Sequence, residues 1–398
     1  MPRITAGQAL RKIRVLDVSR VRAGPTCVRF LADYGADVIR VEPPPGVDPN
    51  DNMFVDSRDS GDFQNLNRNK RSLTLNLKQP EGRAVFHKLV ETADVVVENW
   101  RPDVKQRLGV DYETLRAVNP RIILASISGF GQDGPYSMRP GFDQIIQGMG
   151  GMMSVTGLPG QGPVRAGIAV ADSSAGLYSA IGIFMALLER EQSGEGQWVN
   201  TSLLHAQIAM MDFQMARYLN EGDVPAQAGN DHPLASPMGI VHAQDGIVNL
   251  GVSGSGSWRR FCEALEKPEW LEDARFAELG DRITHRAELM AEIEKVTLTL
   301  PVSHWVEILN KAGVPTGPVY SVPQVFEDAQ VRHSGVTATA RSSTGQEHTF
   351  VTSPVQLMRT PGSVVAAAPD IGEHTDEVLT EAGYTVHDIA RLRAGRIV

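Results

Sequence analysis

The feature that most constrains the fold is an alternation of short apolar runs and helical patterns between residues 13 and 128. Five apolar runs are predicted strands, at 13–19, 36–42, 71–77, 94–99 and 121–128. The last two are almost continuously apolar, which is typical of strands buried on both faces of a parallel sheet. Strands and helices that alternate at this spacing predict βαβ units, and therefore an α/β fold around a mostly parallel sheet.

The chain of 398 residues is too long for one ordinary core, so we expect two domains or one elaborated domain. Near residue 220 a polar segment rich in Gly and Pro is typical of a linker or an open loop. A strand pattern, a glycine turn and amphipathic helical patterns follow it. We therefore expect a large domain at 1–222, a smaller domain at 223–329, and the return of 330–398 to the large domain.

Composition and charge argue against several classes of protein. The net charge of −9 and the absence of a basic cluster argue against a nucleic-acid or anionic-membrane partner. Two cysteines, Cys27 and Cys262, cannot form a disulfide framework and fit a reduced, cytoplasmic setting. No side chains show metal-ligand spacing, so we expect no metal site. The N-terminus lacks the apolar stretch of a signal peptide, and the most apolar run, 175–188, predicts a buried core helix.

Two glycine-rich loops each allow a functional and a structural interpretation. The stretch GFGQDG at 129–134 matches G-x-G-x-x-G and follows a predicted strand, as a dinucleotide site requires. However, Pro135 and Pro140 prevent a helix from opening there, so a flexible loop is favoured over the cofactor site of a nicotinamide oxidoreductase. The second loop, at 251–260, is either a turn or a lid that closes over a site.

Candidate ligand-binding residues lie where the predicted strands end. Asn99 and Trp100 are at the carboxyl end of the strand at 94–99, the edge at which open α/β sheets bind ligands. Trp100 is suited to stacking on a flat ring, and Arg107 to pairing with a phosphate. The alternative is an ordinary strand-to-helix turn. The cations of 67–72 either bind phosphate or form a solvated face.

Asp172 lies just before the most apolar run of the chain. An Asp followed by two serines ahead of a predicted helix is typical of an N-cap, and from this pattern alone capping is the favoured role. No Ser–His–Asp or Cys–His arrangement can be assembled with the residues elsewhere in the chain.

Seven stretches, taken together and in order, resemble the class III coenzyme A transferase family, which includes formyl-CoA transferase. They lie at 15–44, 67–77, 93–112, 127–136, 141–157, 163–183 and 312–322, and so extend over nearly the whole chain. The resemblance implies an interlocked homodimer. It also implies a large Rossmann-like domain built from both chain ends, with a smaller α+β domain between them.

The resemblance assigns the catalytic role to Asp172, which in the family attacks an acyl-CoA thioester and passes through an aspartyl anhydride and an aspartyl-CoA thioester. Desolvation by the apolar helix would sharpen this nucleophile, whereas the helix N-terminus would lower its pKa and keep it ionised at neutral pH. The implied partners are an acyl-CoA and a small carboxylic acid. CoA thioesters serve as co-substrates, and no cofactor is permanently bound.

The resemblance also assigns ligand-binding residues. CoA binding falls to seven positions, Asn99, Trp100 and Arg107, and more loosely Arg40, Arg71, Leu73 and Arg139. Gly254 and Gly256 lie in the glycine loop that closes over the intermediates in formyl-CoA transferase, although serines and a valine interrupt that loop in this chain.

Two departures from the family pattern bear on the substrate. Related racemases of α-methylacyl-CoA use a histidine at the position of Phe142, and because phenylalanine cannot transfer a proton, racemase activity is disfavoured. Arg22 replaces a glutamine or an apolar residue. As a guanidinium in the acyl pocket it would favour a dicarboxylate such as succinate, and the alternative is a surface or CoA-phosphate residue. The remaining alternative to an enzyme is a non-catalytic acyl-CoA-binding protein, which would have no use for a nucleophile at Asp172.

Overall fold

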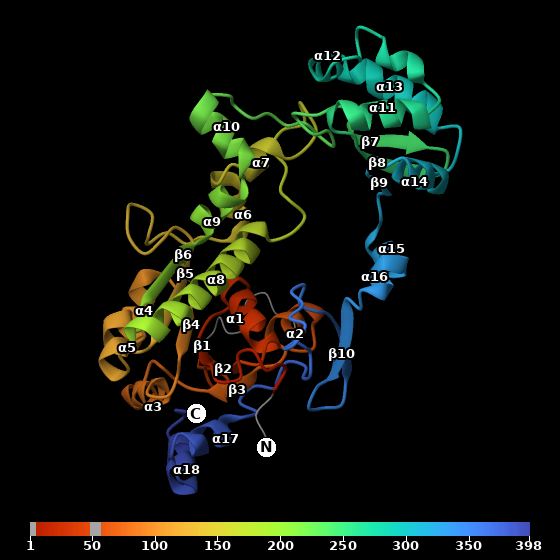
Figure 1. Ribbon diagram of the computed structural model, residues 1–398. Helices are drawn as coiled ribbons and strands as arrows, with labels where there is room; N and C mark the ends of the chain where they lie inside the picture. The colour runs from red at the N-terminus through yellow and green to blue at the C-terminus, as the bar shows by residue number, and fades with distance from the viewer. Residues whose placement is uncertain (1–4, 48–56) are drawn as a thin grey trace. The chain divides into compact units, whose positions relative to one another are not determined.

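The computed structural model describes residues 5–47 and 57–398. The chain divides into two compact units, whose elements are labelled in Figure 1. The large unit comprises the described residues of 1–152, 165–220 and 334–398, and the small unit comprises 153–164 and 221–333. Residues 153–164, expected in the large domain, thus belong to the small unit. The Gln227 side chain contributes to this, because its Nε2 donates to the carbonyls of Thr156 and Gly162.

A six-stranded parallel sheet with the order β3-β2-β1-β4-β5-β6 forms the centre of the large unit. Its strands are β1 Arg14–Asp17, β2 Asp37–Glu42, β3 Arg71–Thr74, β4 Val95–Glu98, β5 Ile123–Ser128 and β6 Trp198–Ser202. The predicted α/β class is confirmed. The edge strand β6 was not predicted, because its sequence WVNTS is mixed and its residues are exposed or half-buried.

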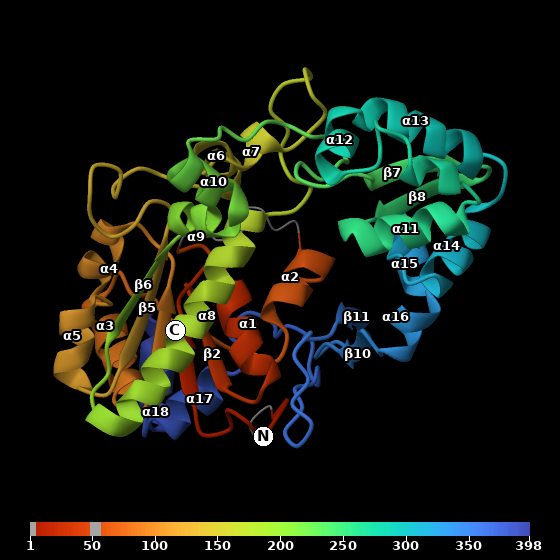
Figure 2. The same cartoon turned by 45° about the horizontal axis from the view of Figure 1, so that its top comes forward.

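The helices of the large unit cover both faces of this sheet (Figure 2). They are α1 Ala23–Asp33, α2 Gly61–Asn67, α3 Pro80–Val90, α4 Pro102–Leu108, α5 Tyr112–Val118, α6 Asp143–Met149, α8 Val170–Ser193, α9 Leu203–Met210, α17 Thr375–Glu381 and α18 Val386–Ala394. Two further helices, α7 Met152–Val155 and α10 Phe213–Glu221, straddle the boundary with the small unit. A hairpin of β10 Thr337–Arg341 and β11 Glu347–Val351 completes the large unit.

Alternate residues of the central strands enter two separate hydrophobic cores. Leu16 and Val96 pack with α3, α5, α17 and α18, whereas Val15, Val95 and Val97 pack with α1, α8 and α9. Every residue of β4 is buried, which explains why its sequence shows no alternation of apolar and polar residues. The C-terminal helices thereby contribute to the same core as the first strands.

The longest helix, α8, packs against α1, α9, β5 and β6. By length and composition it is the one described helix that could cross a membrane, and 44% of its most apolar window is buried inside the protein. Packing against the rest of the unit accounts for the buried part of this window, while apolar side chains such as Met185 and Leu188 remain exposed. Gly176 allows the close approach to α1, because a Cβ at this position would lie 2.5 Å from the carbonyl oxygen of Ala23. The start of α8 is thereby held beside the start of α1.

The small unit is built on the antiparallel sheet β7-β8-β9, with strands at Met238–Ala243, Gly246–Gly251 and Thr316–Pro318. Its helices are α11 Gly254–Ala264, η1 Pro268–Leu271, α12 Leu279–Thr284, α13 Arg286–Thr297, α14 Val302–Lys311, α15 Val322–Glu327 and α16 Ala329–His333. In its core Trp258 stacks with Phe261 and with Trp270. The unit therefore has an α+β architecture with its own hydrophobic core.

Candidate active site

Two neighbouring cavities lie in the large unit where its parallel strands end. The first, the strand-edge cavity, has a volume of about 680 Å³, and its lining includes Val18, Leu75, Lys78, Arg83, Trp100 and Arg107. The second, the Asp172 cavity, has a volume of about 640 Å³, and its lining includes Arg22, Arg58, Asp62, Phe142, Arg165 and Asp172. Arg20, Val41, Glu42 and Pro43 line both cavities, which therefore share a wall.

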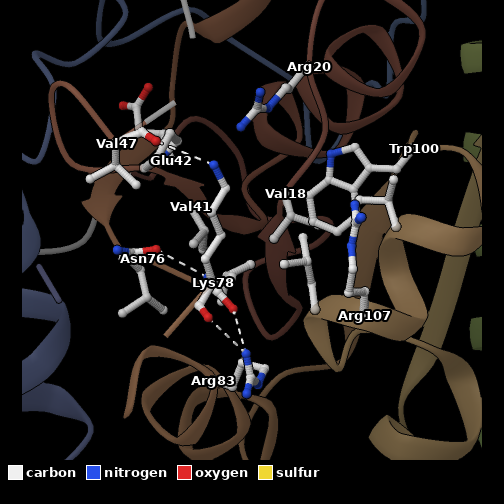
Figure 3. A pocket seen from close by; sticks show the side chains of 15 residues that line it. Val18, Arg20, Val41, Glu42, Val47, Asn76, Lys78, Arg83, Trp100 and Arg107 are labelled. Carbon is white, nitrogen blue, oxygen red and sulfur yellow. Dashed lines mark hydrogen bonds between the residues drawn. The ribbon is translucent and has the colours of Figure 1, made fainter. Parts of the chain in front are cut away.

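The strand-edge cavity combines an aromatic ring with basic side chains (Figure 3). Trp100 and Arg107 lie side by side on one wall, with Lys78 on the other side of the cavity. Lys78 Nζ donates to the carbonyl of Val47, and Arg83 Nη1 donates to the carbonyl of Lys78. Such a cavity is suited to a ligand that carries both a flat ring and phosphate groups.

Of the predicted CoA-binding residues, the structure brings Trp100 and Arg107 together in the strand-edge cavity, while Arg40 lines the Asp172 cavity. Leu73 is fully buried in the hydrophobic core and lines neither cavity. Arg139 is exposed, with its guanidinium 3.7 Å from the centre of the Tyr136 ring, and it also lines neither. Ligand binding by the side chain of Leu73 is therefore not consistent with its position.

The cations of 67–72 neither form a solvated face nor turn toward a phosphate site, so both expectations are corrected. Arg68, Lys70 and Arg71 are almost completely buried and pair with Asp33, Asp17 and Asp37 respectively. Arg71 also binds Glu377 and Glu381 of α17. Buried ions require such partners because they have lost their hydration. These ion pairs hold β3 and the residues just before it against the rest of the large unit.

Asn99 was predicted to bind CoA, but its side-chain amide is engaged with the protein backbone. Its Oδ1 accepts from the N–H of Arg20 at 2.8 Å, and its Nδ2 donates to the carbonyl of the same residue at 2.6 Å. Ser19, on the same loop, bonds to Asp17 through its backbone N–H and its hydroxyl. The loop at 19–22 lines the cavities, so Asn99 acts on the site by fixing this loop.

Asp172 is not the N-cap of α8, so the capping prediction was wrong. The cap position is Ala169, with no side-chain cap bond, and Asp172 lies inside the first turn. The nearby N–H of Ala171 donates instead to Oδ1 of Asp143, at 2.9 Å. Among the described residues the carboxylate of Asp172 has no hydrogen-bond partner, and it is half-buried in the Asp172 cavity. A carboxylate without donors is more nucleophilic than one engaged as a cap.

The electrostatic surroundings of Asp172 raise its pKa from 3.8 to about 6. Burial is the largest cause, the carboxylate of Asp143 acts in the same direction, and Arg22 opposes both. Of the two opposed effects expected from the sequence, desolvation and the helix N-terminus, desolvation prevails, since the net change is a raised pKa. Asp172 is still mostly ionised at neutral pH.

Asp143 and Arg165 are site residues that sequence reasoning missed. Oδ2 of Asp143 accepts from Arg165 at 3.0 Å and from Gln147 Nε2 at 2.8 Å, while its Oδ1 caps α8. The i,i+4 spacing of Asp143 and Gln147 could have suggested one of these bonds. Only tertiary structure brings Arg165 and α8 to the same carboxylate.

A second cluster, of which only Arg40 was a candidate from the sequence, forms one wall of the Asp172 cavity. Glu42 accepts from Arg40 and, through two nitrogens, from Arg58, and both guanidiniums lie over the ring of Phe63. Burial acts to raise the pKa of Glu42, but the two arginines and Ser72 overcome it and lower the pKa to about 2. Glu42 is therefore a permanently charged structural anion between the cavities.

The predicted substrate residues of the large unit, Arg22 and Phe142, both line the Asp172 cavity. Phe142 is the N-cap residue of α6, and its side chain is 46% exposed. Arg22 Nη2 donates to both carboxylate oxygens of Asp62, at 2.9 and 2.8 Å. An aromatic ring thus occupies this part of the cavity, and no histidine is found among the described residues of its lining.

The two glycine loops differ in structure from simple open loops. At 129–134, the N–H of Gly131 bonds to Ser128 Oγ and Gln132 is bound by Lys105, while the next helix, α6, begins only at Asp143. This loop therefore places no helix N-terminus at a dinucleotide. In the small unit, α11 begins at Gly254, so Gly254 and Gly256 belong to its first turn and the connecting loop is shorter than 251–257. Their predicted role at the substrate stays a prediction.

No group of three or more His, Cys, Asp or Glu residues within 5–47 and 57–398 is arranged to hold a metal ion. Cys27 and Cys262 are both buried free thiols, and burial raises the pKa of each to about 12. The carboxylate of Asp172 shares its cavity with several arginines and the ring of Phe142.

Comparison with known proteins gives a family match over most of the chain. The model of CoA-transferase family III matches residues 10–375. The chain is 40% identical to the succinate–glutarate CoA-transferase of Agrobacterium fabrum, over 94% of this chain and 95% of that protein. It is 37% identical to a succinyl-CoA:mesaconate CoA-transferase of Haloarcula marismortui, over 94% of this chain and 96% of that protein.

Solved structures show the same similarity. The crystal structure of a CAIB/BAIF family protein from Brucella suis superposes with a TM-score of 0.83 at 34% identity. The superposition covers 94% of this chain and all of that one. The similarity therefore extends over both units of the chain.

Proposed function

Because the chain belongs to CoA-transferase family III, and is therefore a CoA-transferase, we propose that it moves CoA between short dicarboxylic acids of the succinate type. The names of the Agrobacterium and Haloarcula relatives support this substrate class. The observation that carries the proposal is the presence of Arg22 and Asp172 in the same cavity, because it supplies a cation for a second carboxylate beside a free nucleophilic one.

We infer that the nucleotide end of CoA occupies the strand-edge cavity. Trp100 offers a face for the adenine ring, and Arg107, Lys78 and Arg83 offer charge for the phosphates. The wall formed by Arg20, Val41, Glu42 and Pro43 then leads from that cavity to Asp172. The pantetheine arm would follow this wall and bring the thioester to the carboxylate.

The proposed reaction begins when a carboxylate oxygen of Asp172 attacks the thioester carbon of the donor. The new C–O bond gives an aspartyl anhydride, and the C–S bond breaks with release of CoA thiolate. The thiolate attacks the aspartyl carbonyl carbon, so that an aspartyl-CoA thioester forms and the donor acid leaves. The acceptor carboxylate then attacks that thioester, releases thiolate and forms a second anhydride. Attack of the thiolate on the acceptor carbonyl yields the new acyl-CoA and restores Asp172.

The surroundings of Asp172 suit this sequence of steps. Each step exchanges one anionic leaving group for another, so the chemistry needs no general acid or base. Only an ionised Asp172 attacks, and its pKa of about 6 leaves it mostly charged at neutral pH. Because the carboxylate has no described hydrogen-bond partner, no donor has to be removed before it reacts.

We also propose that the protein acts as an interlocked homodimer. Exposed apolar side chains gather on the outer side of α8 and on α9 and α10, where they include Ile181, Met185, Leu188, Met210 and Leu219. Monomeric proteins rarely expose so many apolar side chains on neighbouring helices. Sedimentation of the wild-type protein should give twice the chain mass, and Leu188→Glu should weaken the association.

Trapping the acylated enzyme tests the proposed function. Incubation with succinyl-CoA followed by hydroxylamine should convert the Asp172 side chain to a hydroxamate that peptide mass spectrometry locates. Asp172→Asn should give no hydroxamate and no transfer. Asp133→Asn, on an exposed loop, is the matched control and should behave like the wild type. A modified peptide without Asp172, or turnover by Asp172→Asn, would contradict the proposal.

A further inference from the structure

The ion pair between Arg22 and Asp62 has an unusual position. It joins the residue that precedes α1 to the first turn of α2, and both side chains line the Asp172 cavity. The pair is open to solvent, with 31% of the Arg22 side chain and 53% of the Asp62 side chain exposed. Exposed pairs of this kind contribute little to stability. We therefore look for the role of this ion pair in the chemistry of the site and not in the stability of the fold.

The backbone around Arg22 is held in a costly conformation. Val21 has a φ of +61°, a value that branched side chains rarely adopt. Asn99 fixes the preceding residue, Arg20, through two hydrogen bonds, and Gly24 lies so close to Ser19 that a Cβ there would be 2.1 Å from the Ser19 side chain. Strain of this kind persists where the surroundings enforce it, and it gathers at functional sites. The loop thus fixes the backbone position from which the Arg22 side chain extends.

Arg22 is the arginine of this cavity best able to receive a substrate anion. Arg40 and Arg58 are committed to the buried Glu42, and Arg165 to the buried Asp143. The Arg20 side chain is seen at the neighbouring strand-edge cavity in Figure 3. Arg22 is bound through Nη2 alone, to an exposed partner, and its Nε and Nη1 have no hydrogen-bond partner among the described residues.

Because two nitrogens of Arg22 have no partner within the described part of the chain, this side chain could also pair with Asp172 and block the proposed reaction. Asp172 is an unpartnered carboxylate in the cavity that holds Arg22. Of the other charged groups that line this cavity, Asp143 on α6 repels Asp172 and is itself paired with Arg165. Arg40 and Arg58 are paired with Glu42, and Arg20 also contributes to the lining. Because Glu42 and Asp143 already have arginine partners, Asp172 is the anion of this cavity with which a guanidinium released from Asp62 could pair. A bidentate pair would occupy the lone pairs that must attack the thioester.

We propose that Asp62 is a positioning residue that holds Arg22 as the receptor for the distal carboxylate of the substrate and keeps it from pairing with Asp172. The inference rests on the proposed function, since it names how that site selects dicarboxylates. An incoming distal carboxylate replaces or shares the contact of Asp62 with Nη2, which is a weak and exposed contact. Arg22 is therefore paired with a carboxylate other than Asp172 both before and after the substrate binds.

Four variants test this: Asp62→Asn, Asp62→Glu, Arg22→Met and the double variant Asp62→Asn/Arg22→Met. The measurement is kcat/KM for the acceptor with succinyl-CoA as donor. Glutarate and pentanoate are compared because they match in length and differ in the second carboxylate. Asp62→Asn should lower kcat/KM for both acceptors about tenfold and move the acid limb of the pH profile to lower pH, because Arg22 then pairs with Asp172. Asp62→Glu should recover most of this loss.

Arg22→Met should lower kcat/KM for glutarate about tenfold more than for pentanoate. The double variant should match Arg22→Met, since Asp62 has nothing to hold once Arg22 is gone. An unchanged pH profile in Asp62→Asn, or losses that multiply in the double variant, would overturn the inference. Asp133→Asn again serves as the unaffected control.

Calorimetric titration with glutarate alone separates this inference from the proposed function. If the wild-type protein binds glutarate but transfers no CoA, and Arg22→Met and Asp62→Asn bind glutarate more weakly, the proposed function fails and the inference stands. If CoA transfer is normal in the wild type and all four variants retain its kinetics and its glutarate affinity, the inference fails and the proposed function stands.

Discussion

The raised pKa of Asp172 predicts that removing the charge of this carboxylate stabilises the fold. The folded-state pKa of about 6 lies above the ordinary value of 3.8, so the folded protein binds this proton more tightly than the unfolded chain does. Stability attributable to this group therefore rises as pH falls from 6 toward 4, and the charged form carries a penalty at neutral pH. Asp172→Asn keeps the shape of the side chain and removes that penalty.

The magnitude follows from the same values. A shift from 3.8 to about 6 corresponds to about 3 kcal/mol, and because Asp172 is only half-buried we discount this to about 2 kcal/mol at pH 8. At pH 4.5 most copies of Asp172 are protonated in the folded state, and the advantage of Asp172→Asn falls to about one third of its pH 8 value.

Urea denaturation of the wild type and Asp172→Asn at pH 8 and pH 4.5 measures this difference. The urea midpoint of the variant should be higher at pH 8, and the gap should narrow at pH 4.5. Asp133→Asn, which changes an exposed residue of the loop after β5, should show no gap at either pH. An Asp172→Asn variant less stable than the wild type at pH 8 would refute the reasoning, because it would mean that the carboxylate makes favourable contacts in the folded protein.

Three further predictions concern activity and packing. The kcat/KM for succinyl-CoA should fall about tenfold for each unit of pH below 6, since only ionised Asp172 attacks; initial rates from pH 4.5 to 8 check this, and a flat profile would contradict it. Trp100→Ala should raise KM for the acyl-CoA about tenfold while changing kcat less, because it removes a stacking face remote from the reacting carbon; saturation kinetics with Trp198→Ala as control measure it. Gly176→Ala should lower the melting temperature by several degrees, because its Cβ would meet the Ala23 carbonyl at 2.5 Å, whereas Gly167→Ala, which has open space around it, should not.

The sheet could be predicted well because its strands are specified locally. In the run 94–99 three consecutive valines, Val95–Val97, replace the alternation of apolar and polar residues, as burial on both faces of a parallel sheet requires. The edge strand β6 was not predicted because it pairs with β5 on one side only. Its residues stay exposed or half-buried, so its sequence WVNTS retains polar residues. Elements with the strongest burial were thus the easiest to find.

The roles of charged residues could not be assigned in the same way, because the sequence does not show with which group a charged side chain pairs. Arg71 has the residue type of a phosphate ligand, yet its partners are Asp37 and, more than 300 positions later, Glu377 and Glu381. Asn99 likewise has the residue type and the position of a ligand residue, but both polar atoms of its side-chain amide form hydrogen bonds with the backbone of Arg20. That Trp100 and Arg107 line one cavity could be expected, because both follow the carboxyl end of β4 closely in the chain and their placement needs no distant partner; their binding of CoA stays a prediction.

The error over Asp172 shows how function can depend on a contact that no local pattern contains. The residues at 172–174 look like a cap because Asp and Ser accept from the N–H groups of a helix start. In the structure Asp143, the first residue of α6, accepts from the N–H of Ala171, so Asp172 does not have to make this contact. The same carboxylate also raises the pKa of Asp172. Asp143 therefore spares Asp172 the capping contact but disfavours its ionisation, and Asp143→Asn should keep an acceptor for the Ala171 N–H while lowering the pKa of Asp172.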